Sequence, residues 1–334
     1  MEIKINKLPK SEVEIEGEIP FSDLEKHKSS ALKNLSSNLS IPGFRKGHVP
    51  EKIAIEKIGE GALLAEMAEI ALSEAYPKII IDNKIDPISR PNVTITKLAK
   101  GNPLGFKLRV PVIPETKLPD YKQIAKKIVS IKEEIVATKE EKENLINQIL
   151  DSKKDKDGNR PELTDDFIKT IGDFKDLNDF NEKIESGIKK EKEYREKEKK
   201  RIQIMEEIIL KSEMDLPDII IEGELEKMIA GFKSDIEKMG LKVDEYLKNS
   251  GKTEEGLRKE WRGEAEKKGK SQLILNKIAI EEKIYPKADD LEKETEHLMS
   301  HYKDADKNRV KVYVETMLTN EAVLKFLEEP EKNS

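Results

Sequence analysis

The sequence predicts an elongated protein in which an α+β N-terminal domain, an antiparallel sheet with helices, precedes an all-α domain of long helices. Before residue 115, short segments alternate apolar and charged residues, whereas later apolar residues recur with helical period. Charged residues make up 39% of the chain and aromatic residues 5%. This composition is typical of long helices with much solvated surface, and it disfavours a single large core.

The N-terminal domain, 1–115, is predicted to place helices between two pairs of strands. Ile3 and Ile5, and then Val13, Ile15 and Ile19, alternate with charged residues as half-buried strands do. Further strands are expected at 93–95 and 106–112, and helices at 22–37, from residue 50, and at 59–81. Strand pairs separated by helices predict an antiparallel sheet that is covered on one face.

Two local signals refine these helices. Ser22-Asp23-Leu24-Glu25 has the pattern of a capping box, in which Ser22 and Glu25 satisfy amides of the first turn, so the helix should begin there and run to Ser37. Pro77 is expected to kink or split the helix at 59–81, because proline removes one helical hydrogen bond.

Residues 116–137 are predicted to be an extended linker, because Pro114 and Pro119 disfavour helix. The helical domain, 138–334, starts at a second capping box, Thr138–Glu141. Its first helix ends at a short charged turn near 151–160. Later helices are expected at 164–171, 176–212, 217–239, 243–247, 253–284, 288–302 and 305–327.

Composition also excludes several functions. The net charge is −6, so any nucleic-acid contact must come from a local basic cluster. The chain has no cysteine, no export-signal core at its N-terminus and no apolar stretch of about 18 residues, so we expect a cytoplasmic protein without membrane contact. No nucleotide-binding or nucleophile motif is present, which predicts no cofactor and no ATP-driven step.

Histidines and carboxylates supply no diagnostic site. His297 and His301 have the i, i+4 spacing that can chelate zinc, but no third ligand is evident, and a solvated helix face is the preferred interpretation. Paired carboxylates occur throughout the chain, so none of them indicates acid–base catalysis. We therefore predict neither a metal site nor a catalytic residue.

The most informative segment is the loop tip Gly43, Phe44, Arg45, Lys46 and Gly47, which joins two predicted helices. Flanking proline and glycine make such a tip stiff and exposed. Its two cations can neutralise phosphates, and its aromatic ring can stack or enter an apolar crevice. On chemistry alone, an ordinary helix connection with the ring folded onto the core is the favoured alternative.

The full pattern Gly-Phe-Arg-Lys-Gly-x-x-Pro, ending at Pro50, resembles the signature with which bacterial trigger factors dock beside the ribosomal exit tunnel. Other segments agree with that family in order and spacing. They are Lys84–Pro87 with Arg90-Pro91, Phe106–Glu115, Pro161–Ile168 and Asp215–Pro217.

The resemblance implies that Phe44, Arg45 and Lys46 contact the ribosome, while Gly43 and Gly47 let the tip turn. It implies that 1–115 is a ribosome-binding domain and that 138–334 is an arm-bearing chaperone domain. The expected partners are protein and rRNA of the large ribosomal subunit near the exit tunnel, unfolded nascent polypeptides, and a second copy in a weak homodimer off the ribosome. The expected function is ATP-independent shielding of nascent apolar segments, partly in the ribosome-associated state.

The family's usual prolyl isomerase domain is missing from the sequence. The helix that starts at Thr138 meets Pro161 across only the charged turn, and no Gly-rich β segment or aromatic cluster stands between them. We therefore predict no isomerase activity. An isomerase with a degenerate site is one alternative, and a helical scaffold that binds one folded partner is the other.

Apolar residues on the predicted arm helices are candidates for polypeptide binding. Flexible Met and Leu surfaces adapt to varied partners, which suits binding without sequence specificity. Helix packing is the alternative role for each of them. The candidates are Met228, Ile229, Phe232, Met239, Leu241, Tyr246, Leu247, Met317 and Leu318.

Overall fold

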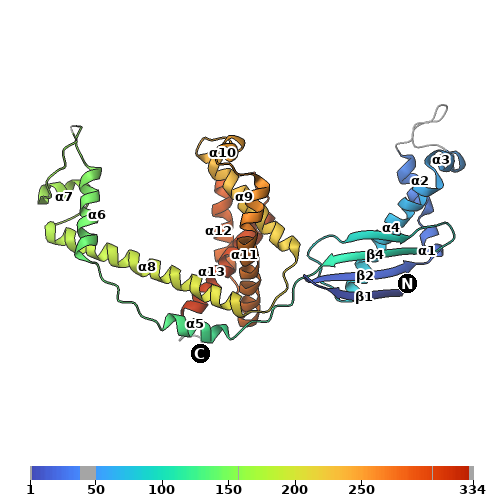
Figure 1. The fold of residues 1–334 in the computed structure, drawn as a ribbon, viewed down its shortest axis with the longest axis horizontal. Coiled ribbons are helices and arrows are strands. Elements are labelled where there is room, and N and C mark those ends of the chain that lie inside the picture. The colour runs from blue at the N-terminus through green and yellow to red at the C-terminus, as the bar shows by residue number, and fades with distance from the viewer. Residues whose placement is uncertain (1, 38–49, 157, 303, 331–334) are drawn as a thin grey trace. The chain divides into compact units, whose positions relative to one another are not determined.

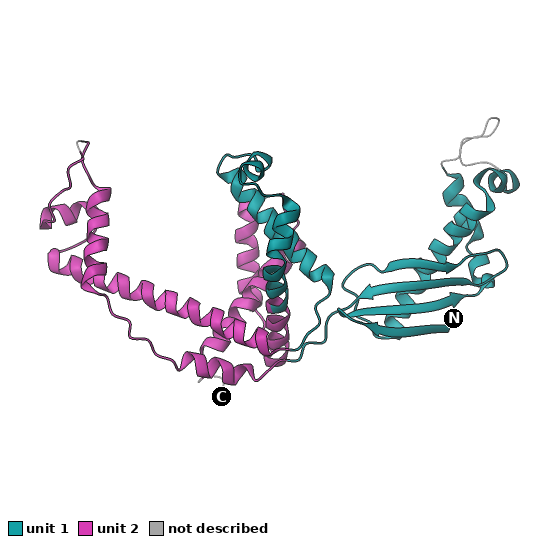
Figure 2. Ribbon diagram, in the orientation of Figure 1, with its two compact units in different colours: residues 1–117, 213–270 teal, residues 118–212, 271–334 magenta. Residues whose placement is uncertain are grey.

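The computed structural model describes residues 2–37, 50–156, 158–302 and 304–330 (Figure 1). The chain forms two compact units, and both are discontinuous in sequence (Figure 2). Unit 1 contains residues 1–117 and 213–270, and unit 2 contains residues 118–212 and 271–334.

The N-terminal part of unit 1 is built on a four-stranded antiparallel sheet, as the alternating segments predict. Its strands are β1 (Glu2–Leu8), β2 (Glu12–Ile19), β3 (Asn92–Lys97) and β4 (Leu104–Pro111), in the order β1-β2-β4-β3. The central register pairs Ile5 with Ile15 and Ile15 with Leu108. Because paired residues share a face, this register puts the apolar side chains of three strands on one side of the sheet.

The apolar face of the sheet packs against four helices: α1 (Phe21–Glu25), α2 (Lys28–Ser36), α3 (Glu51–Ile58) and α4 (Glu60–Asp82). Ile15 and Phe106 are almost fully buried there against Met67 and Leu72 of α4. Burying one such side chain contributes about 1.5–3 kcal/mol. The opposite face is charged, and its buried Glu14 lies 3.5 Å from the Lys107 ammonium and 3.4 Å from the Arg109 guanidinium. The alternation therefore specifies the register.

Two helix predictions in this part need correction. The Ser22 capping box is wrong, because the helix begins at Phe21 with Pro20 as its N-cap, and the Pro20 carbonyl accepts the amides of Asp23 and Leu24. The helix also breaks at 26–27, so α1 and α2 replace one long helix. Pro77, in contrast, does not split α4, which remains helical over 23 residues.

The remaining part of unit 1 is the arm, residues 218–270, which contains α9 (Asp218–Lys238), α10 (Val243–Asn249) and the first part of α11 (Glu254–Glu282). Leu225 of α9 and Leu257 of α11 are buried in it. Ion pairs join the two long helices, with 2.6 Å between Arg262 and Asp218 and 2.7 Å between Lys233 and Glu254. These exposed pairs align the helices and add little stability, since solvent screens them.

In the part that the structure describes, unit 2 consists of helices joined by irregular segments and contains no strand. Its elements are α5 (Tyr121–Val129), α6 (Lys139–Ser152), α7 (Asp165–Ile171), α8 (Leu177–Lys211), the end of α11, α12 (Ala288–His301) and α13 (Lys307–Glu328). The expected extended linker at 116–137 contains α5, for which the Asp120 side chain accepts the Gln123 amide at 2.9 Å. Pro119 precedes the N-cap residue Asp120 and lies outside the helix, so it does not interrupt the helical hydrogen bonds.

The second capping box, at Thr138, is confirmed. The Thr138 hydroxyl accepts the Glu141 amide at 3.2 Å, and the Glu141 carboxylate accepts the Thr138 amide at 2.9 Å. Lys192 of α8 also binds Glu141, at 2.6 Å. The Lys192 ammonium and the Thr138 amide lower the pKa of Glu141 to about 2. Together with the buried Ile168, Phe180 and Ile184, these contacts hold α6 and α7 on the first turns of α8.

Arg201 of α8 connects that helix to α13. Its guanidinium forms two hydrogen bonds with the Glu321 carboxylate, at 2.8 and 3.2 Å, and it also pairs with Glu328. The Arg201 side chain is only 14% exposed and that of Glu328 only 11%. The two carboxylates raise the pKa of Arg201, and Arg201 lowers the pKa of Glu321. Across the described ranges, the structure contains no helix of sufficient length and apolarity to cross a membrane.

Candidate functional site

Gly43, Phe44, Arg45, Lys46 and Gly47 lie outside the described residues. The helices on either side of them are described, and both are anchored. Lys28 of α2 pairs with Glu51 of α3 at 2.9 Å. The Asn34 amide of α2 donates to Glu66 of α4 at 2.8 Å.

The helices α2 and α3, which flank residues 38–49 in the sequence, therefore pack on the same core. Ala31 of α2 and Ala54 of α3 are fully buried, and such small side chains let the helices approach their neighbours closely. Glu51, through its hydrogen bond, raises the pKa of the Lys28 ammonium. This arrangement supplies a firm base for a short connecting segment.

An aromatic cluster organises the end of the arm. The Phe232 ring of α9 packs edge-to-face against Tyr246 of α10, at 5.9 Å, and against Trp261 of α11, at 5.4 Å. Such pairs add about 0.5–1.5 kcal/mol beyond the burial of their area. Phe232 therefore has a packing role, while Tyr246 keeps 39% of its surface exposed. Trp261 is the only tryptophan of the chain, so its fluorescence reports on this cluster.

The turn after α9 presents two apolar side chains to solvent. The amide of Leu241 donates to the Ile236 carbonyl at 3.2 Å, and that of Gly240 to the Glu237 carbonyl at 2.9 Å. With Gly240 at φ +75°, this is a Schellman motif, for which glycine is the preferred residue. Met239 on one side of Gly240 is 70% exposed and Leu241 on the other is 49% exposed.

The other predicted arm residues differ in accessibility. Ile229 is only 3% exposed, so it is a core residue of the arm, and the packing alternative describes it. Met228 and Leu247 are half-buried. The structure thus brings 228–247 together in unit 1, with Met239, Leu241 and Tyr246 as its most accessible apolar side chains.

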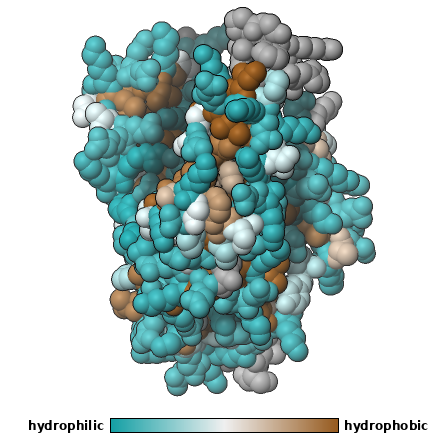
Figure 3. All heavy atoms as spheres, turned by 90° about the vertical axis from the view of Figure 1, so that its right-hand side faces the viewer, coloured by the Kyte–Doolittle hydropathy of each residue, from teal (hydrophilic) through white to brown (hydrophobic). Residues whose placement is uncertain are grey.

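Met317 and Leu318 belong to unit 2, where they lie on α13. Met317 is 37% exposed and Leu318 is half-buried. Tyr313, one turn earlier on the same side as Met317, is also exposed, and so is its neighbour Val312. The sequence analysis missed Val312 and Tyr313. No motif marks them, and which side of α13 faces solvent is evident only from the burial of Val314. Figure 3 shows a face of the molecule where hydrophobic patches interrupt a hydrophilic surface.

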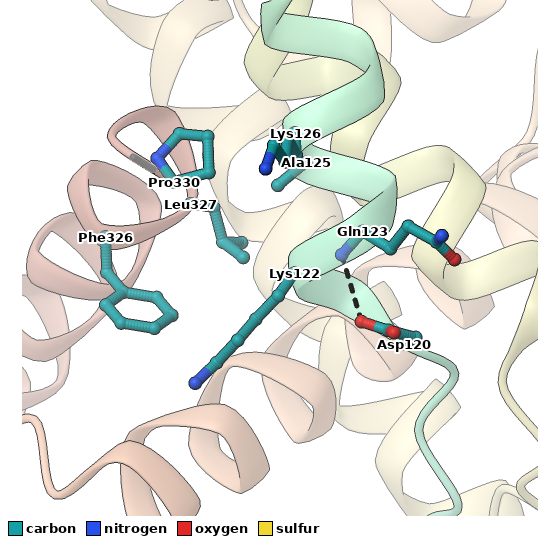
Figure 4. A pocket seen from close by; sticks show the side chains of 8 residues that line it. All are labelled: Asp120, Lys122, Gln123, Ala125, Lys126, Phe326, Leu327 and Pro330. Atoms are coloured by element: carbon teal, nitrogen blue, oxygen red, sulfur yellow. Dashed lines mark hydrogen bonds between the residues drawn. The ribbon is translucent and has the colours of Figure 1, made fainter. Parts of the chain in front are cut away.

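A cavity of about 380 Å³ lies between α5 and the end of α13 (Figure 4). Lys122 extends along it with its ammonium 5.5 Å from the centre of the Phe326 ring and 2.9 Å from Glu282. The neighbouring Tyr121 hydroxyl donates to Glu282 at 2.6 Å. Burial and Glu282 raise the pKa of Tyr121. The Lys122 ammonium and the Tyr121 hydroxyl thus share the Glu282 carboxylate as their partner.

The histidine pair is exposed on α12. The rings of His297 and His301 stand 5.1 Å apart and nearly perpendicular, and His297 lies 3.5 Å from Glu294. Within the ranges that the structure covers, no group of three or more His, Asp or Glu side chains could hold a metal ion. Both side chains of the pair are exposed to solvent.

Two family models match the chain. One, described as bacterial trigger factor protein, matches residues 1–149, and the other, described as the C-terminus of that protein, matches residues 176–330. Curated relatives named trigger factor are similar over nearly the whole length. That of Halothermothrix orenii is 24% identical over 404 aligned residues, covering 94% of each chain, and that of Clostridium botulinum strain Hall is 23% identical over 427, covering 99% of each.

These alignments are longer than the 334 residues of the chain, so the C. botulinum relative has at least 93 residues without a counterpart here. A length near 100 residues is that of a typical domain. A solved structure reported for promiscuous substrate recognition by the trigger factor chaperone has the same fold. It superposes with a TM-score of 0.61 at 17% identity and covers 98% of this chain and 99% of its own. The chain belongs to the bacterial trigger factor family.

Proposed function

We propose that the protein is an ATP-independent chaperone that docks at the exit tunnel of the large ribosomal subunit and shields apolar segments of nascent chains. The observation that carries this proposal is the set of apolar side chains exposed at the turn of a well-packed arm, Met239, Leu241 and Tyr246. Family membership supports it, because the family's described activity is that of a chaperone. Burying exposed Met and Leu on a client supplies binding energy without sequence specificity.

The proposal assigns docking to Phe44, Arg45 and Lys46 in residues 1–115, and polypeptide binding to 138–334. Each apolar contact is weak by itself. Docking places the arm near the emerging chain, and the resulting effective concentration makes several weak contacts sufficient. Off the ribosome, we propose a weak homodimer in which the same apolar surfaces are covered.

If clients bind at the arm, one double variant should suppress client aggregation much less effectively. Met239→Glu with Leu241→Glu should require about tenfold more protein to suppress aggregation of unrelated unfolded proteins, because two apolar contacts are lost. Light scattering of the client measures this, and the emission of Trp261 follows binding of clients that lack tryptophan.

The matched control is Asn249→Asp with Ser250→Asp, which adds the same charge at exposed polar positions of the same arm. It should behave as the unmodified protein does. Equal activity of both variants would exclude the arm turn as a client surface. Suppression for one client alone would favour the scaffold alternative.

We propose that the chain has no prolyl isomerase activity. The family models leave only 150–175 unmatched between them, too few residues for a domain of about 100. In a proline-limited refolding assay, the protein at catalytic concentration should leave the slow phase unchanged. A slow phase accelerated in proportion to enzyme concentration would contradict this proposal and would support the degenerate isomerase.

A further inference from the structure

An apolar groove lies in the N-terminal part of unit 1, and its lining includes none of the predicted client-binding residues. It has a volume of about 830 Å³ and lies between α4 and β3, and the segment 87–91 also lines it. Ala68 and Leu72 of α4, Val93 and Ile95 of β3, and Leu108 of β4 line it.

The groove exists because α4 presents small side chains where it faces β3. Ala65, Ala68 and Ser73 are the small residues on this face of α4. Val93 and Ile95 point to the same side of the sheet as the buried Leu108 and Phe106, with which they pair. They nevertheless remain 48% and 41% exposed. Two β-branched side chains therefore face the helix without reaching it.

The strand beside the groove is an edge strand. In the described sheet β3 pairs only with β4, so one row of its backbone N–H and C=O groups has no strand partner. Edge strands in proteins are normally short, charged or covered, because such a row is a template for another strand. Here the row adjoins an apolar channel.

A polar group inside the groove also lacks a partner. The hydroxyl of Tyr76, on the groove face of α4, is buried and has no hydrogen bond in the described structure. Desolvation raises the pKa of this phenol. Burial without a hydrogen-bond partner is unfavourable for a hydroxyl, so this side of the groove is not optimally packed.

We propose that this groove binds an extended segment of unfolded polypeptide as a fifth strand beside β3. The backbone of the segment pairs with the free row of β3, and alternate apolar side chains enter the groove between β3 and α4. The class of occupant rests on the proposed chaperone function.

The position of the groove between β3 and α4 selects an unfolded segment over a folded partner. The occupant must insert one whole face of its strand between β3 and α4. In a folded protein that face of an edge strand is covered by the partner's own core, so it cannot enter here. A nascent or unfolded segment has both faces free.

The test uses a unique cysteine, since the chain has none. Ser73→Cys, at an exposed position lining the groove, carries an environment-sensitive fluorophore on the full-length protein. The probes are a nine-residue peptide of alternating Val and Thr and two derivatives with N-methyl groups on its odd or its even amides. One derivative should bind at least about tenfold more weakly than the parent, and the other should bind like it, because only alternate amides face β3.

Three outcomes would overturn the proposal. Absence of a fluorescence change with the parent peptide excludes peptide binding. Equal affinity of all three peptides reduces the groove to a plain apolar pocket. A change that depends on protein concentration alone, with a dimer in sedimentation, assigns the groove to a second copy of the chain.

Further variants distinguish loss of binding in the groove from unfolding and from loss of binding at the arm. Ile95→Glu should abolish the fluorescence change on adding peptide. Thr94→Glu should retain it, because Thr94 lies on the opposite face of the sheet, where it pairs with Lys107. The Met239→Glu, Leu241→Glu arm variant should bind the peptide normally, so failure of the arm assignment and failure of the groove assignment remain distinguishable. Retention of binding by Ile95→Glu would contradict the assignment.

Discussion

Replacing Phe44, Arg45 and Lys46 together by alanine is expected to abolish co-sedimentation of the protein with ribosomes. The change removes the two cations that can neutralise rRNA phosphates and the aromatic ring that can stack or insert. We expect the affinity to fall by at least about a hundredfold, since charge-assisted and stacking contacts at one tip are each worth 1–3 kcal/mol. Ultracentrifugation through a sucrose cushion measures the bound fraction.

The matched control is Lys190→Ala, Tyr194→Ala and Arg195→Ala, which removes one aromatic ring and two cations from exposed positions of α8. This variant should co-sediment normally. Binding of the unmodified protein should weaken steeply as salt rises, because contacts with phosphate release counterions. Undiminished binding of the loop variant would exclude these residues as the docking tip.

Arg201→Met is expected to destabilise unit 2 by about 3 kcal/mol, toward the lower end of what removal of one partner from a buried ion pair costs. The substitution leaves the carboxylates of Glu321 and Glu328 without the guanidinium that binds both. Lys197 still lies 3.1 Å from Glu328 and limits the loss. Hydrogen exchange of α8 and α13 amides measures the change.

The pH dependence of this variant is a second readout of the same contact. In the unmodified protein Arg201 lowers the pKa of Glu321, so the stability that this contact contributes is fully present above the unfolded pKa and is lost only as pH falls through the lower pKa of the folded state. Without Arg201, protonation relieves the repulsion between the carboxylates, so the difference between the two proteins should shrink toward pH 4. Arg201→Met with Glu328→Gln should recover part of the loss. A constant difference from pH 7 to pH 4 would show that packing, and not charge, is responsible.

The observed helix ends show which helix boundaries can be predicted from sequence patterns. The helices at 176–212, 217–239 and 288–302 are predicted within one or two residues, because their apolar periodicity is strong and Asp176, Pro217 and Gly240 mark helix ends. Errors arise where a local signal has a competitor. Pro20 displaced the capping role expected of Ser22, and Asp120 started a helix that Pro119 was expected to prevent.

Among the candidate arm residues, sequence could not separate contact surface from packing. Met239 and Ile229 have the same apolar character, yet one is 70% exposed and the other 3%. Ile229 lies on the buried side of α9, whereas Met239 lies in the turn after that helix, and the packing that separates them exists only in the folded arm. The Phe232 cluster illustrates the same limit, since its three rings come from three helices.

The sequence by itself determined the α+β and all-α division, the sheet face that is buried, and the family resemblance carried by the 43–47 loop. These features depend on local periodicity and on residue order, which one chain displays directly. Only the tertiary structure decided that residues 213–270 join the N-terminal unit, that β3 is an edge strand, and that Tyr76 is buried without a partner. Those features depend on segments far apart in sequence, whose pairing is set by packing and not by any pattern within one of them.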